Sequence, residues 1–186
     1  MTLLKGGIQH ATKITTVSPT YATEIRTTEY GCGLEASLEY RGADLIGILN
    51  GIDENVWDPQ NDKALPHPIS PSRPKAGKQA CKLALLNELN LQPNLEMPLF
   101  GVVSRLYDQK GLDLLIDIMP QLMAETHASF ALLGSGDPKE EDAIRELSVS
   151  FSHRIGSFIG FDDGLARRIF AGSDFFIMPS RFEPCG

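Results

Sequence analysis

The end of the chain, residues 180–186, places a carboxylate, Glu183, directly before the tripeptide Pro184-Cys185-Gly186. The apolar residues 175–178 before it predict a buried strand, so Glu183 is expected where a sheet ends. Proline suits the first turn of a helix, because its missing N–H would have no partner there anyway. The free N–H groups of a helix start can bind an anion. This run therefore predicts a carboxylate beside the beginning of a phosphate-binding helix.

A second group of charges lies in residues 104–111, a loop expected between a strand and a helix, which contains Arg105 and Lys110. A helix N-terminus disfavours cations by roughly 0.3–1 kcal/mol per charge, so this placement makes sense if an anion binds between them. Arg can hold a phosphate with two hydrogen bonds, and Lys acts as a point charge. The competing interpretation is a pair of solvated surface cations, one of them paired with Asp108. Taken alone, the loop slightly favours this second interpretation.

A third candidate is Gly134-Ser135-Gly136-Asp137, where a strand is expected to turn into a helix. Glycines let the backbone approach a phosphate, but the full GxGxxG pattern is lacking. A tight turn in which Asp137 caps the next helix explains the same residues equally well. Both interpretations stay open from the sequence.

Other reactive residue types give weaker signals. The histidines show no spacing typical of metal ligation, so no metal site is predicted. Cys185 has no sequence neighbour that could act as its base, so a nucleophilic role is not expected. Trp57, followed by Asp58-Pro59, is interpreted as a packed anchor at a domain junction, with sugar stacking as the alternative.

Composition limits the classes of function. The chain has 186 residues and a net charge of −7, with 42% hydrophobic and 22% charged residues, as in ordinary globular proteins. The charge argues against a nucleic-acid partner, which requires clustered Lys and Arg. The cysteines form no CxxC motif or disulfide framework, so a reducing compartment is expected. No signal-peptide pattern and no membrane-length apolar run is found, so no membrane partner is expected.

From residue 98 onward, apolar strands alternate with helices, which is typical of a parallel sheet covered on both faces. Residues 58–78 contain five prolines and are expected to form a loop or linker. Ligands of such sheets bind where strands end, which is where the candidate residues lie. The expected strands are 13–17, 45–49, 99–103, 129–133, 155–159 and 175–178, and the expected helices are 19–27, 78–89, 112–123, 139–149 and 164–171.

Several segments occur together in one order: Asn50-Gly51-Ile52-Asp53 with Trp57, Val103-Ser104-Arg105-Leu106 with Gln109-Lys110-Gly111, Gly134-x-Gly136-Asp137, and Pro179-Ser180-Arg181-Phe182-Glu183-Pro184-Cys185-Gly186. Taken together, they resemble the family of bacterial glycogen synthases and plant starch synthases. The resemblance covers nearly the whole chain apart from the proline-rich segment. Its most specific feature is the loop with Lys110 combined with the run that ends in Gly186.

This resemblance implies an α/β protein with the GT-B fold of glycosyltransferases, built from two doubly wound, Rossmann-like domains with the active site between them. It implies transfer of glucose from ADP-glucose to the non-reducing end of an α-1,4-glucan, glycogen or starch, with retention of configuration. ADP-glucose is the donor substrate, and no cofactor is implied. Residues 1–57 would end the N-terminal, acceptor-side domain, and 58–96 would form a proline-rich linker and a helix. Residues 97–186 would begin the C-terminal, nucleotide-sugar-binding domain.

The resemblance also implies the roles of site residues. As the catalytic set, Arg105 and Lys110 would clamp the diphosphate and stabilise charge on the departing ADP, and Glu183 would contact the glucose hydroxyls. The implied substrate-binding residues are Asn50 near the reacting sugar, Gly134 and Gly136 at a strand end, Phe161 beside the adenine ring, and Cys185 and Gly186 at the helix start.

The chain departs from the family in ways that leave alternatives open. The family's Lys-Thr-Gly-Gly-Leu-type loop and a histidine near the reacting glucose are absent, and the chain stops in the middle of a motif. It is therefore expected to be an internal piece of a longer enzyme, inactive by itself. One alternative is a non-catalytic remnant that binds nucleotide or glucan weakly, and another is a related enzyme that uses UDP-glucose. The expected location is a bacterial cytoplasm, or a plastid if the source is a plant.

Overall fold

The computed structural model describes residues 2–185, which divide into two compact units. The first unit runs up to Asp53 and also takes in the residues from Glu183 onward, and the second unit runs from Glu54 to Phe182. Each unit buries its own apolar side chains, so each has a separate hydrophobic core.

The first unit contains a two-stranded parallel sheet in which Ile14 lies opposite Leu45. Ser18 begins a helix as the Ser-Pro pattern predicts, because its side chain accepts a hydrogen bond from the Tyr21 N–H. The core is small and is formed by Ile8, Ala22, Leu38 and Leu45. The elements are α1 (Leu3–His10), β1 (Ile14–Thr16), α2 (Pro19–Glu24), α3 (Glu35–Arg41), η1 (Gly42–Asp44) and β2 (Leu45–Gly47).

The second unit is a parallel sheet with the strand order β5-β4-β3-β6, covered by helices on both faces. Its helices are α4 (Pro74–Glu88), α5 (Leu112–Glu125), α6 (Pro138–Ser150) and α7 (Asp163–Gly172), with the 3-10 turn η2 (Asp108–Lys110). Its strands are β3 (Leu99–Leu106), β4 (Ser129–Gly136), β5 (Ile155–Ile159) and β6 (Phe175–Phe176).

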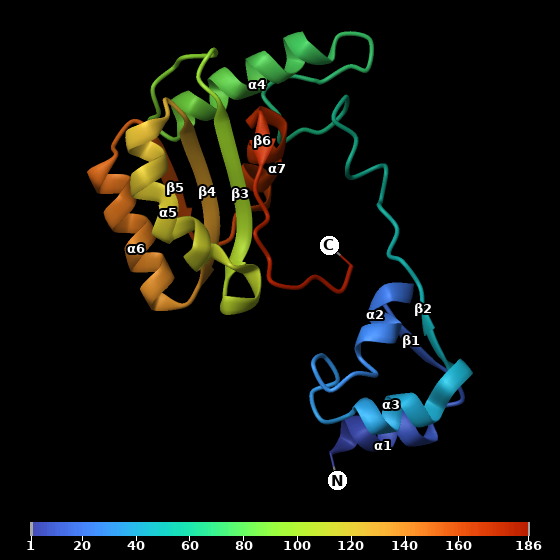
Figure 1. The fold of residues 1–186 in the computed structure, drawn as a ribbon. Helices are drawn as coiled ribbons and strands as arrows, with labels where there is room; N and C mark the ends of the chain where they lie inside the picture. The colour runs from blue at the N-terminus through green and yellow to red at the C-terminus, as the bar shows by residue number, and fades with distance from the viewer. Residues whose placement is uncertain (1, 186) are drawn as a thin grey trace. The chain divides into compact units, whose positions relative to one another are not determined.

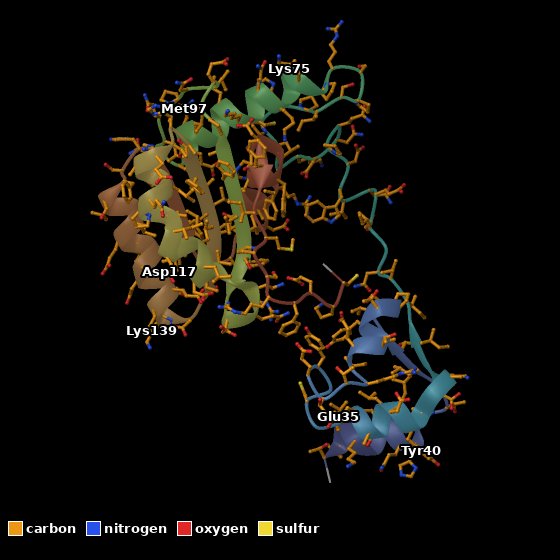
Figure 2. All side chains as sticks on the ribbon, viewed as in Figure 1. Glu35, Tyr40, Lys75, Met97, Asp117 and Lys139 are labelled. Carbon is orange, nitrogen blue, oxygen red and sulfur yellow. The ribbon has the colours of Figure 1, made fainter. Side chains whose placement is uncertain are left out.

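Helices α5 and α6 lie side by side over one face of this sheet (Figure 1). The apolar face of α5 is buried against Phe130 and its neighbours on the strands. The outward residues Asp117 on α5 and Lys139 on α6 project into solvent (Figure 2). The other face is covered by α4 and α7, whose buried residues include Leu85, Leu86, Leu165 and Ile169. This three-layer arrangement is the one that the alternation of strands and helices predicts.

The strand order reverses direction beside β3. The chain moves from β3 to β4 and then to β5 on one side, and it returns to place β6 against the opposite edge of β3. In open parallel sheets, ligands bind outside the carboxyl ends of the strands at such a switch point. The residues that follow β3 and β6 therefore occupy the position where function is expected.

Some predicted boundaries are wrong, for local reasons. Helix α4 begins at Pro74 and not at residue 78, because this proline occupies its first turn. Strand β6 ends at Phe176 because its register with β3 extends only to Gly101. Strand β2 likewise ends at Gly47. Helix α3 is not predicted from the sequence, since its N-cap residue, Leu34, offers no side-chain hydrogen bond.

Candidate functional site

A pocket of about 210 Å³ opens at the carboxyl ends of the central strands of the second unit. Its walls come from the end of β3, the end of β4, the loop after β5 and the first turns of α7. The residues that line it are Val103, Ser104, Arg105, Leu133, Gly134, Ser135, Gly160, Phe161, Asp162 and Ala166. Three residues singled out in the sequence, Arg105, Gly134 and Phe161, are thus brought together.

Arg105 lies within β3 and not in the following loop, and its side chain is exposed at the pocket. Its guanidinium carbon is 6.0 Å from the centre of the Tyr107 ring, a distance at which a cation is attracted to an aromatic face. Among the described residues, no carboxylate forms an ion pair with Arg105. Asp108, the partner that the surface interpretation suggests, contacts Arg181 instead. A cation without a carboxylate partner is suited to bind an anionic ligand.

Lys110 is the last residue of η2 and is not among the described residues that line the pocket. Its backbone N–H donates to the Tyr107 carbonyl over 2.7 Å, which closes the turn after β3. Gly111 follows with a φ of 64°, a left-handed conformation that glycine adopts without strain. The sequence between Arg105 and α5 therefore folds as a tight turn that carries Lys110.

The predicted turn at Gly134-Ser135-Gly136 is wrong, because these residues continue strand β4. Gly134 pairs with Ser104 and Gly136 with Leu106. A Cβ atom on either glycine would lie 2.1 Å from the carbonyl oxygen of its β3 partner. The glycines are therefore required for strand packing. Asp137 caps α6 as expected, since its carboxylate accepts from the Lys139 N–H over 2.8 Å.

Phe161 lies between β5 and α7 with 91% of its surface exposed. Its loop is held to β4 by a hydrogen bond of 2.9 Å from the Gly160 N–H to the Gly134 carbonyl. Asp162, which the sequence reasoning missed, lines the same pocket and caps α7 by accepting from the Leu165 N–H over 2.7 Å. An Asp that precedes an apolar helical position by three residues is an N-cap signal, so Asp162 could have been found.

Asn50, Glu183 and Cys185 belong to the first unit, so they are not among the residues that line the pocket of the second. Asn50 and Cys185 are exposed and Glu183 is partly buried. The buried Ser18 donates its hydroxyl proton to the Pro184 carbonyl over 2.7 Å, which ties this tail to the cap of α2. Gly186 lies outside the described residues.

The helix start predicted at Pro184 is absent from the described part of the tail, which is irregular up to Cys185. The Pro184 carbonyl, which in a helix would accept from a backbone N–H, instead accepts from the Ser18 hydroxyl.

Trp57 belongs to the second unit, where it contacts α7 while 48% of its surface stays exposed. Its ring meets that of Phe170 edge-on at 5.9 Å, and the Arg167 guanidinium lies 5.3 Å from its centre. Arg167 also pairs with Asp62 over 3.3 Å, which fastens the proline-rich segment to α7. The sugar-stacking alternative for Trp57 remains a prediction.

Within residues 2–185, no cluster of His, Cys, Asp and Glu has the composition of a metal site. Within the same residues, no helix has the length and hydropathy needed to cross a membrane.

The arrangement of strands and helices is similar to that of known glycosyltransferases. The catalytic domain of starch synthase IV from Arabidopsis thaliana, bound to ADP and acarbose, superposes with a TM-score of 0.90 at 37% identity, covering 98% of this chain and 38% of that one. HepE from Anabaena, in complex with UDP and glucose, superposes with a TM-score of 0.60 at 21% identity, covering 97% of this chain and 41% of its own length. The chain therefore has the fold of the GT-B glycosyltransferases.

Sequence comparisons specify the family. Residues 1–40 match the starch synthase catalytic domain, and residues 97–186 match the glycosyl transferases group 1. The glycogen synthase of Anaeromyxobacter dehalogenans is 50% identical over 186 residues, which is 100% of this chain and 39% of that protein. The chain belongs to the family of glycogen synthases and starch synthases, and it spans about two fifths of the length of the curated relatives it matches.

Several carboxylates lie near the starts of α5 and α6. Burial raises the pKa of Glu140 above its ordinary value of 4.5, and the charges of Asp113, Asp137 and Asp108 raise it further. The folded protein therefore keeps the Glu140 carboxyl protonated to higher pH than the unfolded chain does. Stability associated with Glu140 is consequently present at low pH and is lost as the pH rises through its folded pKa.

We predict that Glu140→Gln raises the melting temperature at pH 7 by a few degrees and has little effect at pH 4. The amide resembles the protonated carboxyl, so the variant removes a charge that is unfavourable only above the pKa of the unfolded chain. Thermal melts of a full-length enzyme that carries this chain would measure the effect. Glu146→Gln, at an exposed position of the same helix, serves as the control. A lower melting temperature for Glu140→Gln at pH 7 would contradict the prediction.

Proposed function

We propose that the enzyme to which this chain contributes transfers glucose from ADP-glucose to the non-reducing end of an α-1,4-glucan, with retention of configuration. The observation that carries the proposal is the pocket at the carboxyl ends of β3 and β4, with Arg105 at its wall. It occurs in a chain that is 37% identical to a starch synthase with ADP and acarbose bound. This likeness favours a nucleotide-sugar donor and a glucan acceptor.

In this proposal Arg105 and Lys110 hold the diphosphate of the donor and stabilise the negative charge that develops on ADP as the glycosidic bond breaks. The exposed ring of Phe161 stacks on the adenine, and the backbone at Gly134 forms the wall beside it. Glu183 contacts the hydroxyls of the transferred glucose. Asn50, Gly136, Cys185 and Gly186 complete the expected substrate contacts.

The remaining assignments are also proposals. Residues 1–57 contribute to the acceptor-side domain, 58–96 form a linker and a helix, and 97–186 begin the nucleotide-sugar-binding domain. We propose that ADP-glucose acts as a substrate with no separate cofactor, because the cations Arg105 and Lys110 supply the charge that a leaving diphosphate needs. A bacterial cytoplasm is the proposed location, since relatives of the chain are bacterial glycogen synthases.

The test is an assay of a full-length enzyme that carries this chain, with glycogen as acceptor and radiolabelled ADP-glucose or UDP-glucose as donor. The proposal predicts incorporation from ADP-glucose at a kcat/KM at least about tenfold above that for UDP-glucose, unchanged by EDTA. Equal or greater use of UDP-glucose would overturn the choice of donor. No incorporation from either donor would support a non-catalytic remnant.

We predict that Glu183→Gln in the same enzyme lowers kcat by at least about tenfold with little change in thermal stability. Glu183 is only partly buried and follows the carboxyl end of a parallel sheet, where side chains serve ligands more often than cores. Glu96→Gln, at an exposed position before β3, is the matched control. A large fall in melting temperature with near-normal kcat would instead indicate a structural role for Glu183.

A further inference from the structure

The segment after β6 is fastened to the turn after β3 by reciprocal hydrogen bonds. The Arg181 N–H donates to the Gln109 carbonyl over 2.9 Å, and the Gln109 side-chain amide donates to the Phe182 carbonyl over 3.3 Å. These strands are neighbours in the sheet, and the switch point lies between their carboxyl ends. The contact therefore closes the edge of the sheet where ligands of this fold bind.

The Arg181 side chain adds a second set of bonds to the same turn. One guanidinium nitrogen donates to the Asp108 carbonyl over 2.6 Å, and both terminal nitrogens bind the Asp113 carboxylate, over 2.8 and 2.6 Å. Asp113 lies in the first turn of α5. The hydrogen bond from Arg181 holds the pKa of Asp113 below its ordinary value of 3.8, so both groups are charged at neutral pH. A planar, two-point contact of this kind fixes orientation as well as distance.

Gly111 provides the space for the third contact. A Cβ atom at this position would lie 2.2 Å from the Pro179 carbonyl oxygen, and its φ of 64° disfavours other residues. The backbone after β6 can therefore approach the turn only because residue 111 is glycine. Lys110 is the neighbour of Gly111 in the sequence, and Glu183 follows Arg181 by two positions.

We infer that Arg181, Asp113 and Gly111 form a latch that holds the turn carrying Lys110 in register with the segment leading into Glu183. The inference rests on the proposed function, in which Lys110 and Glu183 act on one donor molecule. The latch residues are positioning residues, because they act through Lys110 and Glu183 and not on the substrate. The carboxylates of Asp108 and Asp113 occupy the Arg181 cation, which leaves it unsuited to bind the diphosphate.

The expected effects on stability and on rate distinguish a positioning role of the latch from a role in folding stability. Arg181 and Asp113 are both more than a third exposed, and exposed ion pairs contribute little to folding stability. Displacing a catalytic group by about 1 Å can lower a rate by about 100-fold. Loss of the latch is therefore expected to reduce turnover far more than it reduces the melting temperature.

The experiment measures kcat and KM for ADP-glucose in a full-length enzyme that carries this chain, with the substitutions Arg181→Lys and Asp113→Asn. Lys keeps the charge but cannot make the two-point contact. Each variant is expected to lower kcat by about 10–100-fold while KM changes less. The kcat of the double variant is expected to be no lower than that of the less active single variant, because both substitutions break the same contact.

A matched control is available in the same unit. Arg168 binds Glu88 through two hydrogen bonds of 2.7 Å each, and the side chains are 24% and 38% exposed, against 36% and 40% for Arg181 and Asp113. Arg168→Lys and Glu88→Gln should match the latch variants in melting temperature but keep more than about half of the wild-type kcat. A kcat for the latch variants as high as that of these controls would overturn the inference.

Hydrogen–deuterium exchange supplies a readout that does not depend on activity. Arg181→Lys is expected to increase exchange in residues 107–113 as well as in 177–182, whereas the control variants leave both segments unchanged. An increase confined to residues 177–182 would show that the turn does not depend on the latch, and would contradict the inference. A wild-type enzyme that transfers no glucose would contradict the proposed function, whereas an active enzyme indifferent to latch substitutions would contradict the inference alone.

Discussion

Arg105→Ala and Lys110→Ala should each lower kcat by about 100-fold or more in a full-length enzyme that carries this chain, with the fold intact. Removal of one preorganised donor from a developing negative charge typically costs about 3 kcal/mol of transition-state stabilisation. Arg105 is exposed at the wall of the pocket and no described carboxylate pairs with it, so its loss removes no internal ion pair. The turn that carries Lys110 is closed by backbone hydrogen bonds, which alanine retains.

Steady-state kinetics at saturating ADP-glucose, together with thermal melts, would measure both effects. Lys139→Ala, an exposed cation on α6, is the control for loss of positive charge in the same unit. Either variant that keeps more than about half of the wild-type kcat would refute the role proposed for that residue. A matching fall in melting temperature would assign the loss to folding.

The sheet of the second unit could be predicted because its signals are local. The apolar residues of α5 repeat at helical spacing, and β3, β4 and β5 are mostly apolar segments of the kind that parallel sheets bury. The roles of Gly134 and Gly136 could not be predicted. They depend on the register of β4 against β3, which places both residues beside carbonyl oxygens of a strand that lies about thirty residues earlier in the sequence.

The latch is a second feature that could not be predicted from the sequence, because it depends on contacts between distant segments. Arg181 stands in the run that the sequence singled out, but its partner Asp113 is 68 positions away. Nothing in the spacing of the two residues marks them as a pair, because the strand order that brings β6 beside β3 is a property of the whole sheet. Asp162, in contrast, could have been predicted, because an N-cap is a local sequence signal. This residue also lines the pocket.

The 186-residue chain expressed alone should make no glucan and should be poorly soluble or unfold without a sharp transition. Strand β6 forms an edge of its sheet, and the side chains along and after it are exposed, Phe175 by 55% and Met178 by 54%. In the first unit, Leu3 is 98% and Tyr40 88% exposed. Exposed edges and apolar surface of this kind promote aggregation, and a domain has only about 5–15 kcal/mol of net stability to oppose it.

The test is to purify the chain, record its thermal unfolding and assay glucose transfer from ADP-glucose to glycogen. Under the proposed function the donor and the acceptor are held by different domains, and catalysis requires that both be aligned. The chain spans 39% of a glycogen synthase relative, so much of that alignment is expected to depend on residues outside it. Met178→Lys should increase the soluble fraction without producing activity, which separates aggregation from an incomplete site. A sharp unfolding transition together with measurable transfer would show that these 186 residues suffice, and would overturn the prediction.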